Sequence, residues 1–183
     1  MSGSGHGHGE QLDSEAFREA LSGFPTGVTV VTAVDADGRP VGLTVSSFTS
    51  VSLEPPLILW CIMRSSPSFA VMETVDRFAV NVLTDNQADI SNQFAQPTDD
   101  KFAGIATSPG AGGLPLLDDV VAQFECRTWN RYDGGDHLII VGEVESFRHW
   151  NRAPLIFAHG EYDSIGPAKG LEVSENVWPI KAE

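Results

Sequence analysis

The feature that most constrains this 183-residue chain is a hydroxyl-rich stretch that joins two strand-like segments. Residues 44–52 read Thr-Val-Ser-Ser-Phe-Thr-Ser-Val-Ser and follow closely on Gly42. A buried hydroxyl without a partner costs roughly 1–3 kcal/mol, so this stretch is a poor filling for a hydrophobic core. Short hydroxyl donors beside exposed backbone N–H groups do suit an anion. We therefore interpret residues 44–52 as a cradle for phosphate oxygens.

Length and composition favour a single globular domain with tails. Hydrophobic residues make up 42% of the chain and charged residues 20%. No apolar run approaches the roughly 20 residues that a membrane-spanning helix needs. The N-terminus shows no signal-peptide pattern, so the sequence predicts a cytoplasmic protein that does not enter a membrane.

The charge balance argues against nucleic acid as a partner. The chain has 11 Lys and Arg scattered among 25 Asp and Glu, for a net charge of −14. A surface that follows a phosphate backbone needs clustered cations instead. The two cysteines, Cys61 and Cys126, lack the close spacing of a metal site, so we expect no metal and two buried, reduced thiols.

The N-terminal part of the chain predicts a tail, a helix and a hairpin. Residues 1–11 are rich in Gly, Ser and His and are expected to be disordered. Apolar residues recur at helical spacing over residues 12–24. A β-branched run at 28–34, a turn rich in Asp and Gly at 35–40, and a strand that returns from Val41 predict a hairpin.

Prolines and serines punctuate the next segment. Pro55 and Pro56 exclude a helix and separate two strands. The second strand, residues 57–63, is apolar without alternation, so both of its faces are expected to be covered. Ser66 followed by Pro67 is a helix-start signature with Ser66 as the N-cap. Because helix N-termini bind anions, this start is a second candidate anion site.

The rest of the chain predicts strands, one more helix and a long loop. Asp85 is expected to cap a helix that runs through Phe94. Residues 95–119 are expected to form a long loop that is functional or mobile. Further strands are expected at 78–83, 120–128, 138–147 and 155–157. Six or seven strands with inserted rather than alternating helices predict a mostly antiparallel barrel or sandwich.

Several short motifs, each weak alone, together resemble the flavin reductase-like family, the small reductase components of two-component flavin-dependent monooxygenases. The resemblance covers about residues 15 to 166. Its motifs are Phe-Pro-Thr-Gly at 24–27 with the following strand, the stretch from Gly to Pro-Pro at 42–56, Asn-Val-Leu at 81–83, Gln-Phe-Ala at 93–95, Lys-Phe at 101–102 and Gly-Asp-His at 135–137.

The resemblance implies an FMN-binding split β-barrel of Greek-key type, mostly β with inserted helices. Residues 12–166 would form the domain, and residues 167–183 a C-terminal tail that packs on the partner of a homodimer. It also implies hydride transfer from NADH or NADPH to FMN or FAD, and release of the reduced flavin to a partner monooxygenase. Because the cofactor carries such a reaction, the side chains mainly position it.

Residue by residue, the resemblance implies a flavin site beside a nicotinamide site. His137, in the Gly-Asp-His turn, is the predicted catalytic residue, where it orients the nicotinamide or assists a protonation. The predicted flavin-binding residues are Thr44, Val45, Ser46 and Ser47 around the phosphate and ring edge, Cys61, Met63, Arg64, Ser65 and Ser66 at the strand end and helix start, and Phe94, Lys101 and Phe102 over the flavin tail.

Two other functions stay open at this level. One is an enzyme of the same barrel class with tightly bound FMN that acts on its own organic substrate. The other is a flavin-binding module without catalysis. FMN and FAD, and likewise NADH and NADPH, are not distinguished by these motifs, and the partner monooxygenase is not identified.

Overall fold

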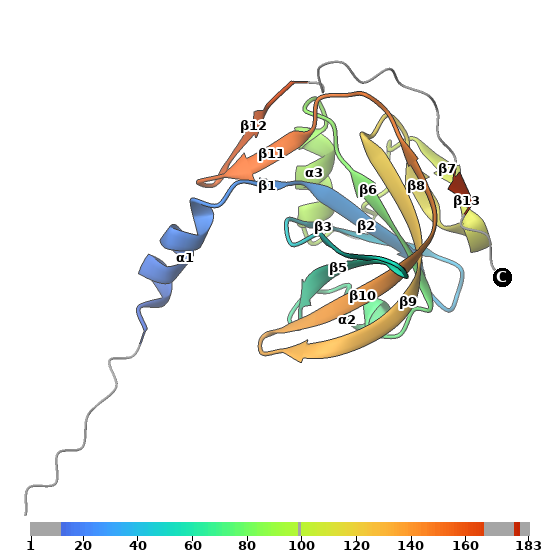
Figure 1. Ribbon diagram of the computed structural model, residues 1–183, viewed down its shortest axis with the longest axis horizontal. Coiled ribbons are helices and arrows are strands. Elements are labelled where there is room, and N and C mark those ends of the chain that lie inside the picture. The colour runs from blue at the N-terminus through green and yellow to red at the C-terminus, as the bar shows by residue number, and fades with distance from the viewer. Residues whose placement is uncertain (1–11, 99, 167–177, 180–183) are drawn as a thin grey trace, which may run out of the picture.

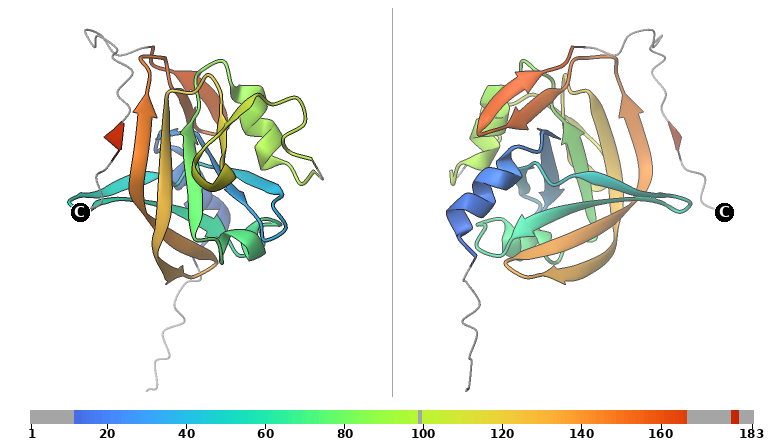
Figure 2. Two further views of the ribbon diagram at one scale, coloured as in Figure 1. Left: turned by 90° about the vertical axis from the view of Figure 1, so that its right-hand side faces the viewer. Right: turned by 60° about the vertical axis from the view of Figure 1, so that its left-hand side comes forward.

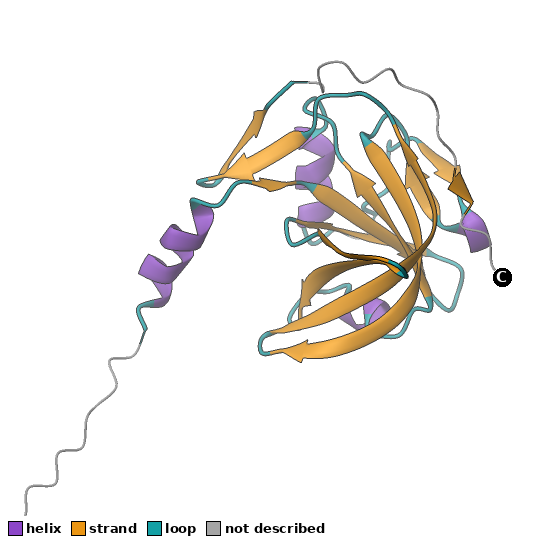
Figure 3. Ribbon diagram, in the orientation of Figure 1, coloured by secondary structure: helices purple, strands orange, loops and turns teal. Residues whose placement is uncertain are grey.

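The computed structural model describes residues 12–98, 100–166 and 178–179. The predicted disordered tail at 1–11 and most of the predicted C-terminal tail at 167–183 lie outside the described residues. Within the described part, strands dominate and the helices are short, as Figure 3 shows. The prediction of a mostly-β fold with inserted helices is therefore confirmed.

One antiparallel sheet forms the body of the molecule. Along it lie, side by side, β3 (Pro40–Val45), β2 (Thr29–Val34), β6 (Arg77–Val82), β9 (Ala122–Gly134), β10 (His137–His149), β5 (Pro56–Met63) and β4 (Thr49–Leu53). A short strand, β13 (Trp178–Pro179), pairs with β10 beside this path. The sheet curls strongly (Figures 1 and 2). Its end strands β3 and β4 are not paired with each other within the described residues.

Two smaller sheets accompany the large one. The first consists of β1 (Thr26–Gly27), β11 (Leu155–Ala158) and β12 (Glu161–Ser164). The second consists of β7 (Thr107–Pro109) and β8 (Pro115–Leu117), which bracket a 3-10 turn, η1 (Ala111–Gly113). The sequence-based expectation of six or seven strands missed most of these, because strands of two to four residues are too short to show a hydrophobic period.

Three α-helices are described: α1 (Ser14–Ser22), α2 (Phe69–Met72) and α3 (Ala88–Ala95). Asp13 caps α1 through its Oδ1, which accepts the N–H groups of Glu15 at 3.0 Å and Ala16 at 3.4 Å. None of the residues of α1 is buried, and the helix points away from the sheet in Figure 1. No helix in the described part of the chain is long and apolar enough to cross a membrane.

Both predicted helix starts are wrong. α2 has Ser68 rather than Ser66 at its N-cap, has no side-chain cap, and is only four residues long. It therefore offers no N-terminal anion site. α3 has Gln87 rather than Asp85 at its N-cap. The Gln87 side chain turns back instead, and its Oε1 accepts the N–H of Thr84 at 3.0 Å.

The expectation that strand 57–63 is covered on both faces is also wrong. Trp60 and Ile62, on one face, are buried in the core, whereas Cys61 is half-buried and Met63 exposed on the other. The strand therefore presents one apolar face to the core, and its second face is partly accessible to a ligand near Cys61 and Met63.

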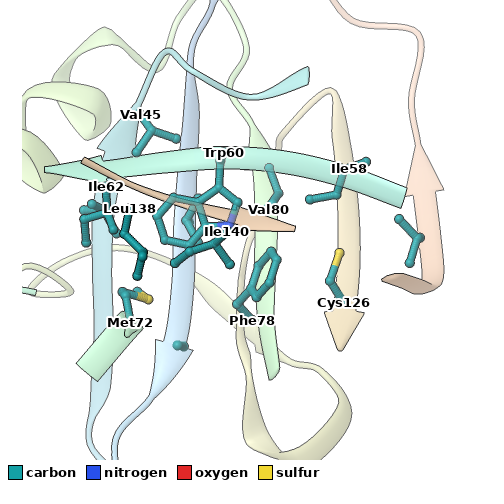
Figure 4. Packing of buried hydrophobic residues seen from close by; sticks show 14 residues of the cluster. Val45, Ile58, Trp60, Ile62, Met72, Phe78, Val80, Cys126, Leu138 and Ile140 are labelled. Atoms are coloured by element: carbon teal, nitrogen blue, oxygen red, sulfur yellow. The ribbon is translucent and has the colours of Figure 1, made fainter. Parts of the chain in front are cut away.

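The main core lies inside the curl of the large sheet (Figure 4). The rings of Trp60 and Phe78 meet edge to face with centroids 5.6 Å apart. A Cβ atom at Gly142 would lie 2.5 Å from Phe78, so the Phe78 ring requires glycine there. Cys126 is fully buried beside them, and burial raises the pKa of its thiol. Cys61 and Cys126 are both free thiols, as predicted, although Cys61 is only half-buried.

Buried polar side chains anchor the long segment 95–119 to the sheet. Asn81 Oδ1 accepts the N–H of Leu117 at 3.0 Å, and Asn81 Nδ2 donates to Val30 O at 3.0 Å. Thr32 Oγ1 donates to Pro115 O at 2.6 Å. Since buried polar groups are stable only when they are hydrogen-bonded, these contacts fix β8 against β2 and β6.

Candidate functional site

The hydroxyl-rich stretch divides into two parts where β3 ends. Val45 closes β3, residues 46–48 form a link, and β4 follows. Ser47 Oγ accepts the N–H of Cys61 at 2.9 Å and donates to the carbonyl of the same residue at 3.2 Å. β4 pairs with β5 only as far as Leu59. The Ser47 hydroxyl therefore satisfies backbone groups that β4 leaves free, and it holds the end of β3 against β5.

A cavity of about 590 Å³ lies beside this link. Its walls come from β3 and the link, the end of β5, the segment before α2, the end of α3 with the loop after it, and the start of β10. The predicted site residues that line it are Thr44, Val45, Ser46, Ser47, Cys61, Met63, Ser65, Ser66, Phe94, Lys101 and His137. The hydroxyls of β4 do not take part, so the candidate cradle narrows to residues 44–47.

The hydroxyls in the cavity differ in what they already bind. Thr44 Oγ1 donates to Ser91 O at 2.6 Å, which ties β3 to α3. Ser66 Oγ accepts the backbone N–H two residues further on at 3.3 Å, which leaves its own proton free. Ser46 and Ser65 are exposed, and their hydroxyls have no hydrogen-bond partner among the described residues. These last two are the donors most available to a ligand.

Lys101 brings a positive charge to the cavity wall. Gln93 Nε2 donates to the carbonyls of Lys101 and Ala103, at 2.9 Å each, which shapes the loop. Lys101 Nζ donates to Phe94 O at 2.8 Å. Burial lowers the pKa of the Lys101 ammonium, because desolvation disfavours the charged form. A phosphate at this position would stabilise that charge again.

His137 reaches the cavity from the hairpin that β9 and β10 form. It is the first residue of β10 and pairs with Met63 at the end of β5. Its Nδ1 lies 2.7 Å from Asp136 Oδ1, and this hydrogen bond lowers the pKa of the Asp136 carboxyl. A carboxylate at Nδ1 favours a proton on that nitrogen. The other ring nitrogen, Nε2, is then available as a hydrogen-bond acceptor. The imidazole is therefore oriented before any ligand binds.

Two predicted flavin-binding residues do not line the cavity. Arg64 turns toward the β9–β10 turn, where Nε donates to Gly135 O at 3.1 Å and Nη2 to Asp133 Oδ1 at 2.5 Å. Its backbone N–H donates to Asp136 O at 2.9 Å, so Arg64 supports the turn that carries His137. Phe102 packs edge-on against the ring of Phe94, with centroids 4.9 Å apart. Arg64 and Phe102 therefore contact residues that line the cavity, or the turn that carries one, without lining it themselves.

Other residues that line the cavity were not singled out from the sequence: Leu43, Ile62, Pro67, Ala95 and Pro97. Leu43 and Ile62 neighbour predicted residues on β3 and β5, and Ala95 closes the Gln-Phe-Ala motif. They carry no reactive group, so only the positions of their neighbours could have indicated them.

Fold and site together define a class of protein. The cavity falls in the range of about 300–1,000 Å³ that small-molecule sites occupy. It combines an apolar lining with free hydroxyls and a desolvated cation, which fits a ligand with a large apolar body and an anionic end. Burial raises the pKa of the Cys61 thiol, so the wall beside it is neutral. The protein is thus a mostly-β protein with a curled, open sheet and a cavity of the size that small-molecule sites have.

The family follows from comparison with known sequences. Residues 21–166 match the family described as flavin reductase like domain, and the chain belongs to this family. The resemblance that the sequence motifs indicated is thereby confirmed.

Individual relatives differ in length. A protein of Rhizobium meliloti (strain 1021), named "Probable flavin reductase", is 47% identical over 153 residues; the match covers 84% of this chain and 49% of the relative. This chain thus spans about half the length of that relative. The reductase subunit HsaB of a flavin-dependent monooxygenase from Mycobacterium tuberculosis (strain ATCC 25618 / H37Rv) is 42% identical, with 87% of this chain and 86% of HsaB covered.

A solved structure has the same arrangement. The NADH:FAD oxidoreductase SgcE6 of Streptomyces globisporus C-1027, in complex with NAD and FAD fragments, superposes with a TM-score of 0.80 at 36% identity. The superposition covers 88% of this chain and 99% of SgcE6. The curled sheet described above is therefore shared with an oxidoreductase of known structure.

Proposed function

We propose that this protein transfers a hydride from NADH or NADPH to FMN or FAD and supplies the reduced flavin to a partner monooxygenase. One observation carries the proposal: residues far apart in sequence, chosen from motifs alone, line a single cavity. Membership of the flavin reductase like domain family supports it, as do relatives named as reductase subunits of flavin-dependent monooxygenases.

The residues at hand fit a flavin. The free hydroxyls of Ser46 and Ser65 and the ammonium of Lys101 would hold the phosphate. Cys61 and Met63, on the outward face of β5, would contact the ring system. A bound flavin supplies an acceptor for the two electrons of a hydride. The protein's part is to hold both rings at contact distance, because positioning is the main contribution that side chains make to such a transfer.

His137 would contact the nicotinamide. Its ring is 36% exposed and lies on the cavity wall, so it borders both the ligand site and solvent. With Nδ1 bound to Asp136, it can offer Nε2 to an amide or move a proton near the flavin. Arg64, the residue after β5, holds the same turn through hydrogen bonds to the carbonyls of Gly135 and Asp136, so it supports the backbone that carries the imidazole.

The proposal extends to the assembly and the location of the protein. The curled sheet, closed at one point by Ser47, would act as a flavin-binding split barrel. A homodimer is expected, and exposed apolar side chains on α1 and just after it support it: Phe17 and Leu21 on α1 are 49% and 57% exposed, and Phe24 beyond its end is 75% exposed. Sedimentation equilibrium of the full chain tests the dimer. A cytoplasmic location agrees with two free thiols.

The test of the activity is loss of NADH or NADPH absorbance in air, with and without added FMN or FAD. We expect oxidation that saturates with free flavin. Oxidation that ignores added flavin and requires an organic substrate would indicate an enzyme with tightly bound FMN. Flavin binding without any oxidation of either nicotinamide would indicate a non-catalytic flavin module.

A further inference from the structure

A second groove of about 400 Å³ lies next to the candidate flavin cavity. Aliphatic and aromatic side chains, chiefly Val41, Val71 and Phe102, form its floor and sides. Arg39, Lys101 and Asp100 bring charges to its rim. The Arg39 guanidinium is 71% exposed and is shared between Asp35 and Asp37 at 2.9 and 2.8 Å. Lys101 is therefore the one desolvated cation among the described residues that line the groove.

The groove continues the cavity along the same walls. Gly42 lines the groove, and Leu43 and Thr44, which follow it on β3, line the cavity. On the other wall, Ser65 and Ser66 line the cavity, and Ser68 and Val71 line the groove. Pro67 and Lys101 border both spaces. The two spaces therefore adjoin at Pro67 and Lys101.

Gly42, which lines the groove, leaves room for two aromatic rings beside β3. A Cβ atom there would lie 2.6 Å from the Phe94 ring and 3.3 Å from the Phe102 ring. Without a side chain at this position, both rings pack directly on the backbone of β3. The Phe102 ring thereby stays half-buried at the side of the groove, edge-on to Phe94.

We infer that the groove is a subsite for the adenosine half of FAD, so that the protein selects FAD over FMN. The inference rests on the proposed function. In the proposed function the phosphate of FMN lies with Ser46, Ser65 and Lys101, and the groove adjoins the cavity at Lys101. In FAD the second phosphate and the adenosine extend from that same phosphate. Lys101 would lie between the two phosphates, and Phe102 would offer an aromatic face or edge to the adenine.

The first measurement compares the dissociation constants of FMN and FAD by quenching of flavin fluorescence, with the full chain. We expect FAD to bind at least about fivefold more tightly, the lower end of what stacking one base on an aromatic side chain contributes. Equal affinities, or tighter binding of FMN, would overturn the inference.

A charge in the groove gives the decisive comparison. Val71→Asp places a carboxylate in the groove and away from the flavin cavity, and it should weaken FAD about five- to tenfold by repulsion of the second phosphate. FMN affinity should stay unchanged. Ala70→Asp is the matched control: it adds the same charge on the neighbouring exposed residue of α2, which lines neither space. It should leave the FAD-to-FMN ratio unchanged.

Phe102→Leu repeats the test by a neutral change and serves if Val71→Asp does not fold. It should lower the FAD-to-FMN affinity ratio toward one. Equal weakening of both flavins by Val71→Asp, or an unchanged ratio in Phe102→Leu, would contradict the subsite. A wild-type chain that binds FAD no more tightly than FMN, with flavin-dependent NADH oxidation intact, would refute only the subsite. Absence of that oxidation would refute the proposed function instead.

Discussion

The charge of Lys101 gives the sharpest test of the phosphate end of the cavity. Lys101→Met keeps a long apolar stem and removes the ammonium. We expect the variant to bind FMN more weakly and to bind riboflavin, which lacks the phosphate, as well as the wild type does. Lys101→Arg, which keeps the charge, should retain most of the FMN affinity.

The size of the effect follows from the setting of the ammonium. Two unit charges 4 Å apart attract by about 4 kcal/mol at an effective dielectric of about 20, before desolvation is subtracted. Lys101 is already partly buried in the free protein, which lowers the pKa of its ammonium, so its share of that desolvation penalty is small. Hydrogen bonds to charged groups retain roughly 1.5–3 kcal/mol net. Lys101→Met should therefore raise the dissociation constant of FMN about 10- to 150-fold.

The dependence on pH has a definite sign. Burial holds the pKa of Lys101 below its ordinary value in the free protein, and a bound phosphate favours the protonated form. FMN affinity is then highest below the free-protein pKa of Lys101 and falls as the pH rises through it. This alkaline decline should be absent from Lys101→Met.

Fluorescence titration with FMN and riboflavin at several pH values measures all of these quantities. An equal loss of affinity for both ligands would mean that the substitution disturbs the loop rather than a phosphate contact. FMN affinity that is unchanged in Lys101→Met would remove Lys101 from the phosphate site.

Four further expectations concern single residues. Ser47→Ala should lower the unfolding free energy by about 1–3 kcal/mol, because the N–H of Cys61 loses its partner. An unchanged urea midpoint would argue against a stabilising hydrogen bond between Ser47 and Cys61. Ser47→Asp should also weaken FMN binding by placing like charge beside the phosphate, and equal FMN affinity would contradict that placement. His137→Ala should raise the KM for the nicotinamide or slow hydride transfer while flavin affinity stays; identical steady-state kinetics would exclude it from the site. Cys61 should react slowly with a thiol reagent at neutral pH, and more slowly with FMN bound, while Cys126 should react only on unfolding. Mass spectrometry of labelled peptides measures both rates, and labelling of Cys61 that is equally fast with and without FMN would contradict its place in the flavin site.

The sequence could predict most of the residues that line the cavity, but it could not predict what each of their hydroxyls binds. Hydroxyls at 44–47 stand out locally, because they suit an anion and not a core. Ser47 hydrogen-bonds to the backbone of β5, whereas the Ser46 hydroxyl has no partner among the described residues. This difference depends on where β4 stops pairing with β5. Such a register is set by contacts between distant segments and leaves no local pattern.

The helix starts also could not be predicted from local sequence patterns. Ser66-Pro67 has the local chemistry of a cap, yet α2 begins later and spans a single turn. The strands around His137 were underestimated for a related reason. β9 and β10 run 13 residues each. The predicted strand at 120–128 stopped before the end of β9, because most residues of β9 near the hairpin tip are exposed and lose their alternation.

The unpaired side of β3 has a consequence for handling the protein. A strand whose backbone groups are not taken up by a neighbour can recruit a strand from another molecule and so begin aggregation. Here α3 is tied to β3 through Thr44, and the end of β3 lines the candidate flavin cavity. A bound flavin would therefore act as a cover for β3. Preparations kept with flavin should resist clouding on storage better than preparations stripped of it.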